Sequence, residues 1–202
     1  MKQNRKRKRI GLFGGSFDPP HIGHCIIAAR AVDQLNLDKV LFIPAYIPPH
    51  KKHRSTSDPR HRLAMTRLAI RGTSTFACSD QEVRRKGVSY TVDTLRDLKR
   101  KFPDAELFLI IGGDSLAFFP SWREPEAILN LASLAVYDRP KVQLQRKQKG
   151  SKRIASIAGP LLDISSSGIR TMVAAGQSIT FLVPQAVERY IRSHRLYRRR
   201  NT

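Results

Sequence analysis

Two histidines three residues apart, His21 and His24, are the side chains in this sequence best suited to chemistry on a phosphate. They follow the glycine-rich stretch Gly14-Gly15-Ser16-Phe17-Asp18-Pro19. If a helix begins near His21, both imidazoles face the same side of its first turn. An imidazole can donate a hydrogen bond and carry positive charge near neutral pH. The pair could therefore stabilise the charge on a phosphoryl group during its transfer.

The glycine-rich stretch has the composition of a phosphate-binding turn. Glycine lets the backbone approach a phosphate closely, Ser16 adds a hydroxyl, and the free N–H groups of a following helix attract an anion. Asp18 and Pro19 would fix the turn through an Asx-type hydrogen bond and a preset φ angle. The stretch matches neither a Walker loop nor the dinucleotide fingerprint, so by itself it is weak evidence.

A zinc pair is the alternative interpretation of His21 and His24. It needs further ligands, and the spacing of the remaining histidines does not supply them: His50, His53, His61 and His194. The two cysteines, Cys25 and Cys78, have no paired spacing, which argues against both a zinc knuckle and a disulfide framework. Cysteines without a disulfide spacing favour a reducing compartment.

A second polar cluster lies late in the chain, in the stretch Ile164-Ser165-Ser166-Ser167-Gly168-Ile169-Arg170. Serine at a helix start is ordinarily an N-cap, and that interpretation stays open for Ser165 and Ser166. Arg170 adds a guanidinium within about one turn. Hydroxyls, free N–H groups and a guanidinium at one helix end form an anion site, and two such sites facing each other could hold a triphosphate.

The elements that would position these clusters alternate between strand and helix. Strands are expected at 9–13, 39–43, 75–78, 107–111, 131–137 and 154–158, and helices at 22–35, 58–71, 90–101, 168–175 and 184–196. Asp58 fits an N-cap with Pro59 at the first helical position. The strand at 107–111 runs into Gly112-Gly113-Asp114, which repeats the strand-then-glycine order of the first cluster. The alternation predicts an α/β fold, a parallel sheet with helices on both faces.

Length and composition favour one folded domain. The chain has 202 residues, 41% of them hydrophobic and 26% charged, which is typical of folded proteins. We expect a single domain at 9–196, a basic arm at 1–8 and a basic tail at 197–202. The basic stretch 141–152 lacks periodicity, and too little chain follows it for a second core, so it is expected to be an exposed loop.

The formal net charge of +21 is concentrated at the two ends. Such arms could contact nucleic acid or another polyanion non-specifically, and solvated termini are the alternative. No stretch approaches the ~20 apolar residues that span a bilayer, and Gly14 to Pro19 interrupts any apolar stretch that should follow a signal peptide's basic start. We therefore expect no membrane partner and a cytoplasmic location.

Together, the stretches from Gly14 to His24 and from Ile164 to Arg170 resemble the two signatures of the nucleotidyltransferase superfamily marked by histidine, a variable residue, glycine and histidine. Three further segments are similar to the bacterial nicotinate-nucleotide adenylyltransferases: Ile47-Pro48-Pro49-His50-Lys51, Ser89-Tyr90-Thr91-Val92-Asp93-Thr94-Leu95, and Ile111-Gly112-Gly113-Asp114-Ser115-Leu116 with Trp122. Val183-Pro184 with Tyr190-Ile191 matches the C-terminal helix of that family. The resemblance covers roughly residues 9 to 192.

The resemblance implies a Rossmann-like doubly wound fold and transfer of AMP from ATP to nicotinate mononucleotide, giving deamido-NAD and pyrophosphate by direct in-line attack. Magnesium would enter with the ATP phosphates, with no metal ligands from the protein. The catalytic residues would be His21, His24 and Arg170. The ATP-binding residues would be Gly14, Gly15, Ser16, Phe17, His24, Gly112, Asp114, Ile164, Ser165, Ser166 and Arg170. The acceptor-binding residues would be Ser16, Lys51, Ser89, Tyr90, Thr91 and Trp122.

Simpler roles stay open for several of these residues. Ser89 could cap the following helix, Trp122 could be core packing, and Gly112-Gly113 could be an ordinary loop. Gly168 departs from the family, which usually carries a larger residue there. Other phosphorylated acceptors remain alternatives, namely phosphopantetheine, nicotinamide mononucleotide and glycerol phosphate. A nucleic-acid-binding protein on an inactive nucleotide fold is the alternative from another class. The sequence does not indicate an oligomeric state.

Overall fold

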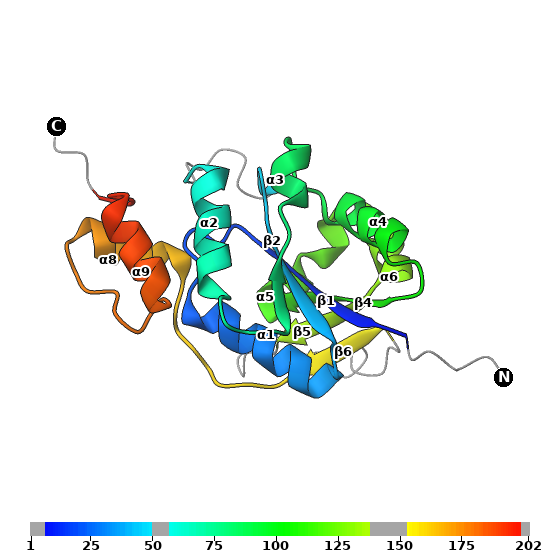
Figure 1. Cartoon of the computed structure of the whole chain (residues 1–202). Coiled ribbons are helices and arrows are strands. Elements are labelled where there is room, and N and C mark those ends of the chain that lie inside the picture. Colours follow the sequence, from blue (N-terminus) through cyan, green and yellow to red (C-terminus); the bar gives the residue numbers. More distant parts are fainter. Residues whose placement is uncertain (1–6, 50–56, 138–152, 199–202) are drawn as a thin grey trace.

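A sheet of six parallel strands lies at the centre of the computed structural model, which describes residues 7–49, 57–137 and 153–198 (Figure 1). The strands are β1 (Arg9–Gly15), β2 (Lys39–Pro44), β3 (Phe76–Cys78), β4 (Glu106–Gly112), β5 (Ser133–Tyr137) and β6 (Ile154–Ile157). Their order is β3-β2-β1-β4-β5-β6, and each neighbouring pair is parallel. The order reverses between β1 and β4. In such doubly wound sheets, ligands bind at the carboxyl ends of the strands beside this reversal.

Helices connect the strands and cover both faces of the sheet (Figure 1). They are α1 (Ile22–Leu35), α2 (Pro59–Ala69), α3 (Gln81–Arg85), α4 (Thr91–Lys101), α5 (Gly113–Ala117), α6 (Pro125–Leu131), α8 (Ser166–Ala174) and α9 (Gln185–Ser193), with a 3-10 turn η2 (Phe119–Ser121). The expected α/β class, parallel sheet and two-sided helix cover are confirmed. The expected bounds of α1 are also those observed, and Asp58 caps α2 with Pro59 at its first position.

One sequence expectation about local structure needs correction. The stretch beginning at Gly14 was expected to turn, but Gly14 and Gly15 still pair with Ile43 and Pro44 as the last residues of β1. The structure also decides an open alternative: Gly112 and Gly113 do not form an ordinary loop, because Gly112 ends β4 and Gly113 begins the helix α5. The short helices α3, α5 and α6 have five to seven residues, too few for a helical period to show in the sequence.

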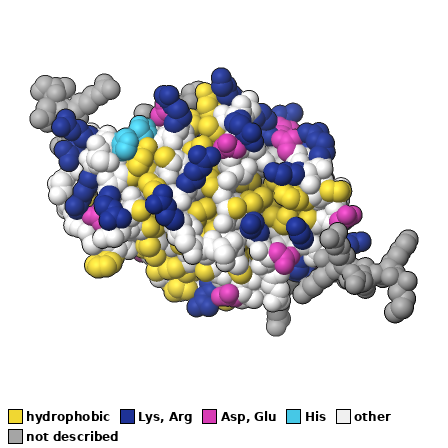
Figure 2. Space-filling model, viewed as in Figure 1, with side chains coloured by type: hydrophobic (Ala, Val, Ile, Leu, Met, Phe, Trp, Pro, Cys, Tyr) yellow, Lys and Arg dark blue, Asp and Glu magenta, His cyan; other side chains and the backbone are white. Residues whose placement is uncertain are grey.

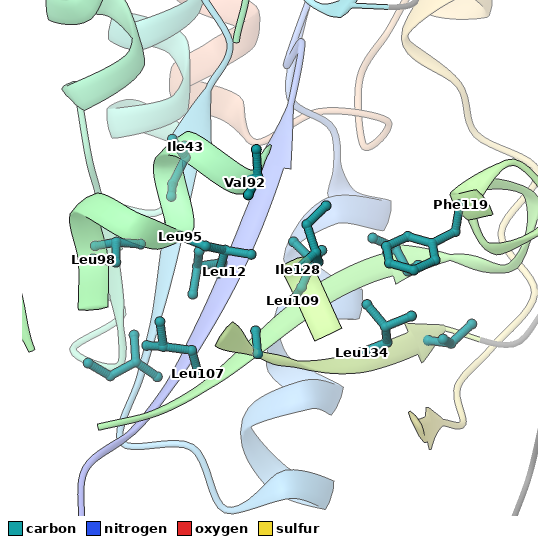
Figure 3. Close-up of a cluster of buried hydrophobic side chains, with 14 of the residues drawn as sticks. Leu12, Ile43, Val92, Leu95, Leu98, Leu107, Leu109, Phe119, Ile128 and Leu134 are labelled. Carbon is teal, nitrogen blue, oxygen red and sulfur yellow. The ribbon is translucent and has the colours of Figure 1, made fainter. Parts of the chain in front are cut away.

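Alternation along the central strands sends side chains to two separate cores. In β4, Leu107, Leu109 and Ile111 face α4 and α6, while Phe108 and Ile110 face the α1 side. Figure 3 shows the first core, where Val92, Leu95 and Leu98 of α4 and Ile128 of α6 lie over Leu12 and Leu109. Both faces of the strands are buried, as is typical of parallel sheets.

A third apolar cluster attaches the C-terminal helices to the rest of the chain. Met65 of α2, Ile169 of α8 and Val187 and Ile191 of α9 are buried together. Figure 1 shows α8 and α9 beside α2, at the end of the molecule away from α4 and α6. This packing brings the start of α8 to the β1–α1 connection, although the two are far apart in sequence.

Candidate active site

A cavity of about 670 Å³ opens at the carboxyl ends of β1 and β4, where the strand order reverses. Its walls come from the end of β1, the segment before α4, the end of β4 and the turn after η2. Of the catalytic and binding residues expected from the sequence, those lining it are Gly14, Gly15, Ser16, Ser89, Tyr90, Thr91, Gly112 and Trp122. The residues of the two polar clusters lie outside its lining: His21, His24, Ser165, Ser166 and Arg170. The position is that at which this class of sheet binds nucleotides.

Two glycines leave the bottom of this cavity open. A Cβ atom added to Gly14 or to Gly112 would have no neighbouring atom within 4 Å. A side chain at either position would therefore extend into open space at the ends of β1 and β4. Glycine keeps the backbone of both strands accessible to a ligand lying across them.

His21 and His24 lie against each other at the start of α1. Their ring centroids are 3.7 Å apart, so the expectation that both imidazoles face one side is confirmed. His21 is the N-cap residue, and its main-chain N–H donates to Nδ1 of His24 at 3.1 Å. Because Nδ1 accepts this bond, the neutral His24 ring carries its proton on Nε2.

Gly23, between the two histidines, is required by the position of the His21 ring. A Cβ atom at Gly23 would lie 3.0 Å from Nδ1 and 3.1 Å from Cε1 of His21. Both distances are shorter than ordinary contact, so a side chain there would displace the ring. The glycine of the histidine motif thus allows the imidazole to lie against the first turn of the helix.

The turn between β1 and α1 is fixed by distant residues. The Asp18–Pro19 peptide bond is cis, and the Asp18 side chain is only 2% exposed. Its carboxylate accepts from the N–H of Ser57 at 3.2 Å and the hydroxyl of Tyr197 at 2.7 Å. The expected Asx-type bond is wrong, because the residue two positions on is Pro20, which has no N–H. Burial, with Asp18 beside it, raises the pKa of the Tyr197 hydroxyl.

The second polar cluster meets the first at this turn. The Ser166 hydroxyl donates to the Pro19 carbonyl at 2.8 Å, and the Arg170 guanidinium donates to the Asp18 carbonyl at 2.7 Å. Ser165 is the N-cap of α8 and accepts from the N–H of Gly168 at 3.1 Å. The N-cap interpretation of Ser165 is therefore confirmed, and the fold brings both clusters together.

Arg62 also holds this region together, and the sequence analysis did not identify it. Its side chain is fully buried, and its guanidinium donates to four main-chain carbonyls, those of Ser16, Ala45, Tyr46 and Ser57. Desolvation lowers the pKa of this guanidinium. A signal was present in the sequence, because Arg62 shares the inward face of α2 with the buried Met65 and Thr66.

Four of the expected acceptor residues line one wall of the cavity: Ser89, Tyr90, Thr91 and Trp122. Tyr90 lies under the guanidinium of Arg123, which is 4.6 Å from the ring centroid. The Trp122 ring packs on Phe119 at 5.5 Å and also lines the cavity, so core packing and access to a ligand both apply to it. Nothing in the sequence singled out Arg123, because an arginine that follows a tryptophan looks like any other surface arginine.

Some candidate residues lie elsewhere. Phe17 is 1% exposed, with its ring 5.0 Å from the His24 ring centroid, so its side chain supports the histidine rather than reaching a ligand. Asp114 is exposed in the first turn of α5 and Ile164 is half-buried before α8; neither lines the cavity. Lys51 lies outside the described residues, as do the stretch 141–152 and most of both basic ends.

The described residues contain neither a group of side chains that could hold a metal ion nor a helix that could span a membrane. Within residues 7–49, 57–137 and 153–198, no group of three or more His, Cys, Asp or Glu side chains could hold a metal ion. Across the same ranges, no helix combines the length and the apolar character needed to cross a bilayer.

One face of the molecule is basic. Figure 2 shows Lys and Arg side chains spread over the face that carries α2 and α9, with fewer Asp and Glu side chains among them. A surface of one predominant sign raises the local concentration of oppositely charged ligands. Anionic substrates are therefore favoured over cationic ones.

Comparisons with known proteins agree with this geometry. The model of the cytidylyltransferase-like family matches residues 12–172. A protein of Thermomicrobium roseum named probable nicotinate-nucleotide adenylyltransferase is 45% identical, covering 94% of this chain and 92% of its own length. One of the same name from Salinibacter ruber is 42% identical, covering 94% and 97%. In fold, the chain is similar to the Plasmodium falciparum nicotinic acid mononucleotide adenylyltransferase complexed with NaAD, with a TM-score of 0.79, 22% identity, and 95% and 98% coverage.

Proposed function

The chain belongs to the cytidylyltransferase-like family and, within it, to the nicotinate-nucleotide adenylyltransferases, and we propose that it transfers AMP from ATP to nicotinate mononucleotide. The products are deamido-NAD and pyrophosphate. One oxygen of the acceptor's phosphate forms a bond to the α-phosphorus of ATP, and the bond from that phosphorus to the bridging oxygen of pyrophosphate breaks. No covalent enzyme intermediate is needed.

One observation carries this proposal: two polar clusters that are far apart in sequence meet at the Asp18–Pro19 turn beside the cavity. Ser166 and Arg170 bond to main-chain carbonyls of that turn, which places the start of α8 next to the histidine pair. Such an arrangement supports binding of a triphosphate between α1 and α8, with Ser165, Ser166 and Arg170 toward the departing phosphates.

The histidines would stabilise charge as the α-phosphorus is attacked. His24 accepts at Nδ1 from the protein, so Nε2–H is the group of its neutral ring that would donate to a phosphate oxygen. In this proposal His21, stacked against it, contributes to the same oxygens. A donor held in place before the reaction stabilises developing charge without reorganisation, and one such donor contributes about 3 kcal/mol in well-studied enzymes.

The acceptor would occupy the cavity wall formed by Tyr90, Thr91 and Trp122. A pyridine ring fits beside an aromatic face, and a carboxylate fits the free N–H groups at the start of α4, where no side chain caps the helix. Arg123 is the positively charged side chain among the described residues of this wall. Its guanidinium complements the acceptor's negative charge.

Magnesium would enter as part of the substrate, bound to the ATP phosphates. Mg²⁺ commonly keeps several waters and is held largely by substrate phosphates rather than by a protein cage. We also place the reaction in the cytoplasm, where free thiols such as Cys25 and Cys78 persist.

The test is pyrophosphate release from ATP and magnesium with three acceptors offered separately: nicotinate mononucleotide, its amide and phosphopantetheine. We expect fast turnover with the acid mononucleotide and about a hundredfold loss with His24→Ala. His194→Ala, at an exposed histidine after α9, serves as the matched control and should keep full activity. Turnover with a different acceptor would refute the substrate, and no turnover with any would refute the enzyme.

A further inference from the structure

A buried carboxylate lies in the wall of the acceptor cavity and has no role in the mechanism above. Glu82, on the short helix α3, is 6% exposed and lines the cavity together with Ser89, Tyr90 and Thr94. Burial of a carboxylate in a site for anionic ligands is costly unless it is hydrogen-bonded. A carboxylate buried at this position therefore requires hydrogen-bond donors around it.

Glu82 accepts a hydrogen bond from α4 and lies beside a second hydroxyl. The Thr94 hydroxyl donates to Oε1 of Glu82 at 2.6 Å, and the Arg85 guanidinium donates to the Thr94 oxygen at 2.9 Å. Burial raises the pKa of Glu82, and the Thr94 and Ser89 hydroxyls lower it. The Ser89 oxygen accepts from the main-chain N–H of Tyr46 at 2.9 Å. The carboxyl group thus joins α3 to α4.

The direction of these bonds is fixed by chemistry. A guanidinium and a main-chain N–H can only donate, so Thr94 and Ser89 accept from Arg85 and Tyr46. Each hydroxyl has a single proton, and that of Thr94 is directed to Glu82. The Thr94 proton is then not available to an acceptor's carboxylate, which would be bound by main-chain N–H groups at the start of α4.

The same network continues to the phosphate side of the site. The Tyr46 carbonyl accepts from Arg62, whose guanidinium also donates to the Ser16 carbonyl at 2.9 Å. The charged groups that act on Glu82 are Arg85 and Arg62, both of opposite sign. Arg85 is itself bonded to Asp97 at 3.0 Å. A chain of bonds thus runs from the β1–α1 turn through Arg62 and Tyr46 to Ser89, which lies beside Glu82.

We propose that Glu82 is a positioning residue that determines how well the enzyme binds its acceptor: it holds Thr94, and with it the start of α4, in the place that receives the acceptor's carboxylate. The inference rests on the proposed function. Glu82 does not contact the reacting atoms, so its loss affects acceptor binding more than the chemical step.

The experiment compares steady-state constants of Glu82→Gln, Thr94→Val and Thr94→Ser with the wild type, with ATP and nicotinate mononucleotide varied separately. Glutamine keeps the shape of Glu82 but removes the charge on which Arg85 and Arg62 act, and its amide oxygen is a weaker acceptor for the Thr94 proton. We expect the KM for nicotinate mononucleotide to rise about tenfold in Glu82→Gln and Thr94→Val, with kcat and the KM for ATP changed less than about twofold. Thr94→Ser keeps the hydroxyl and should restore the wild-type KM.

Glu188→Gln is the matched control, because Glu188 on α9 is also buried and also accepts from a threonine, Thr180, at 3.1 Å. It should leave every constant unchanged. An unaltered acceptor KM in Glu82→Gln, or an equal change in kcat and both KM values, would overturn the role of Glu82. A wild-type enzyme inactive on nicotinate mononucleotide would instead overturn the proposed function, and this inference with it.

Discussion

Replacing Gly23 with alanine should separate activity from stability. Gly23 lies in the first turn of α1, and a Cβ atom there would approach the His21 ring to 3.0 Å. Ordinary carbon contacts are about 3.5–4.0 Å, so the ring must move by several tenths of an ångström. The ring of His24 lies 3.7 Å from that of His21 between centroids, so it would be displaced as well.

Two opposing effects give the expected magnitudes. Alanine is favoured over glycine in a helix by about 1 kcal/mol, which offsets the cost of moving one side chain. A misplacement of ~1 Å can cost a hundredfold in rate, so a shift of several tenths of an ångström should lower kcat/KM about tenfold, or ~1.4 kcal/mol. The melting temperature should therefore stay the same or rise while activity falls.

The assay is pyrophosphate release, with a thermal melt of the same preparation. Proton NMR of the histidine Hε1 signals should show shifts at His21 and His24, with His194 unchanged as the internal control. Gly23→Ala with full activity would refute the steric argument. A loss of activity that only follows a loss of stability would refute it equally, because the effect would then be on folding rather than on the rings.

Three further predictions concern stability and thiol reactivity. Arg62→Lys keeps the charge but cannot reproduce four bonds to carbonyls, so urea unfolding should show a loss of about 3 kcal/mol; wild-type stability would contradict the bonding described for Arg62. Hydrogen bonds from Arg60 lower the pKa of Asp58 to about 2, so its ionised form stabilises the fold above about pH 4 and this contribution is lost as the pH falls through about 2. Asp58→Asn should remove that dependence, and identical stability profiles of variant and wild type between pH 2 and 5 would argue against it. Burial raises the pKa of Cys25 and of Cys78 to about 11, so at pH 8 both should react with a disulfide reagent roughly a hundredfold more slowly in the native protein than in urea; rapid native reaction would contradict this.

The fold class followed from local patterns because each central strand is a continuous apolar run and each long helix has its own period and cap. The strand at 107–111 and the helix at 22–35 lie where the pattern placed them. The short helices α3, α5 and α6 were not predicted, because one or two turns contain no repeat. Gly14 and Gly15 appeared to be a turn because glycine is common in turns, yet pairing with β2 keeps them extended.

The candidate site also combines features that the local sequence predicts with features that depend on the fold. The sequence alone determined which residue types could act on phosphate: the histidine pair, the serines and arginine before and within α8, and the aromatic and hydroxyl residues around Tyr90. Their chemistry is a property of the side chains, and their spacing of three or four residues is set by the helix on which they lie. Both properties depend only on residues that are neighbours in sequence, so they can be predicted without knowing the fold.

Tertiary structure decided everything that depends on contacts between distant residues. It placed Arg170 against Asp18, gave Asp18 its bond from Tyr197, and buried Arg62 and Glu82 among partners from separate elements. It also fixed the tautomer of His24 through a main-chain bond. A buried charge is recognisable only when its surroundings are known, because burial and hydrogen-bond partners come from the packing of the whole chain rather than from neighbours in sequence.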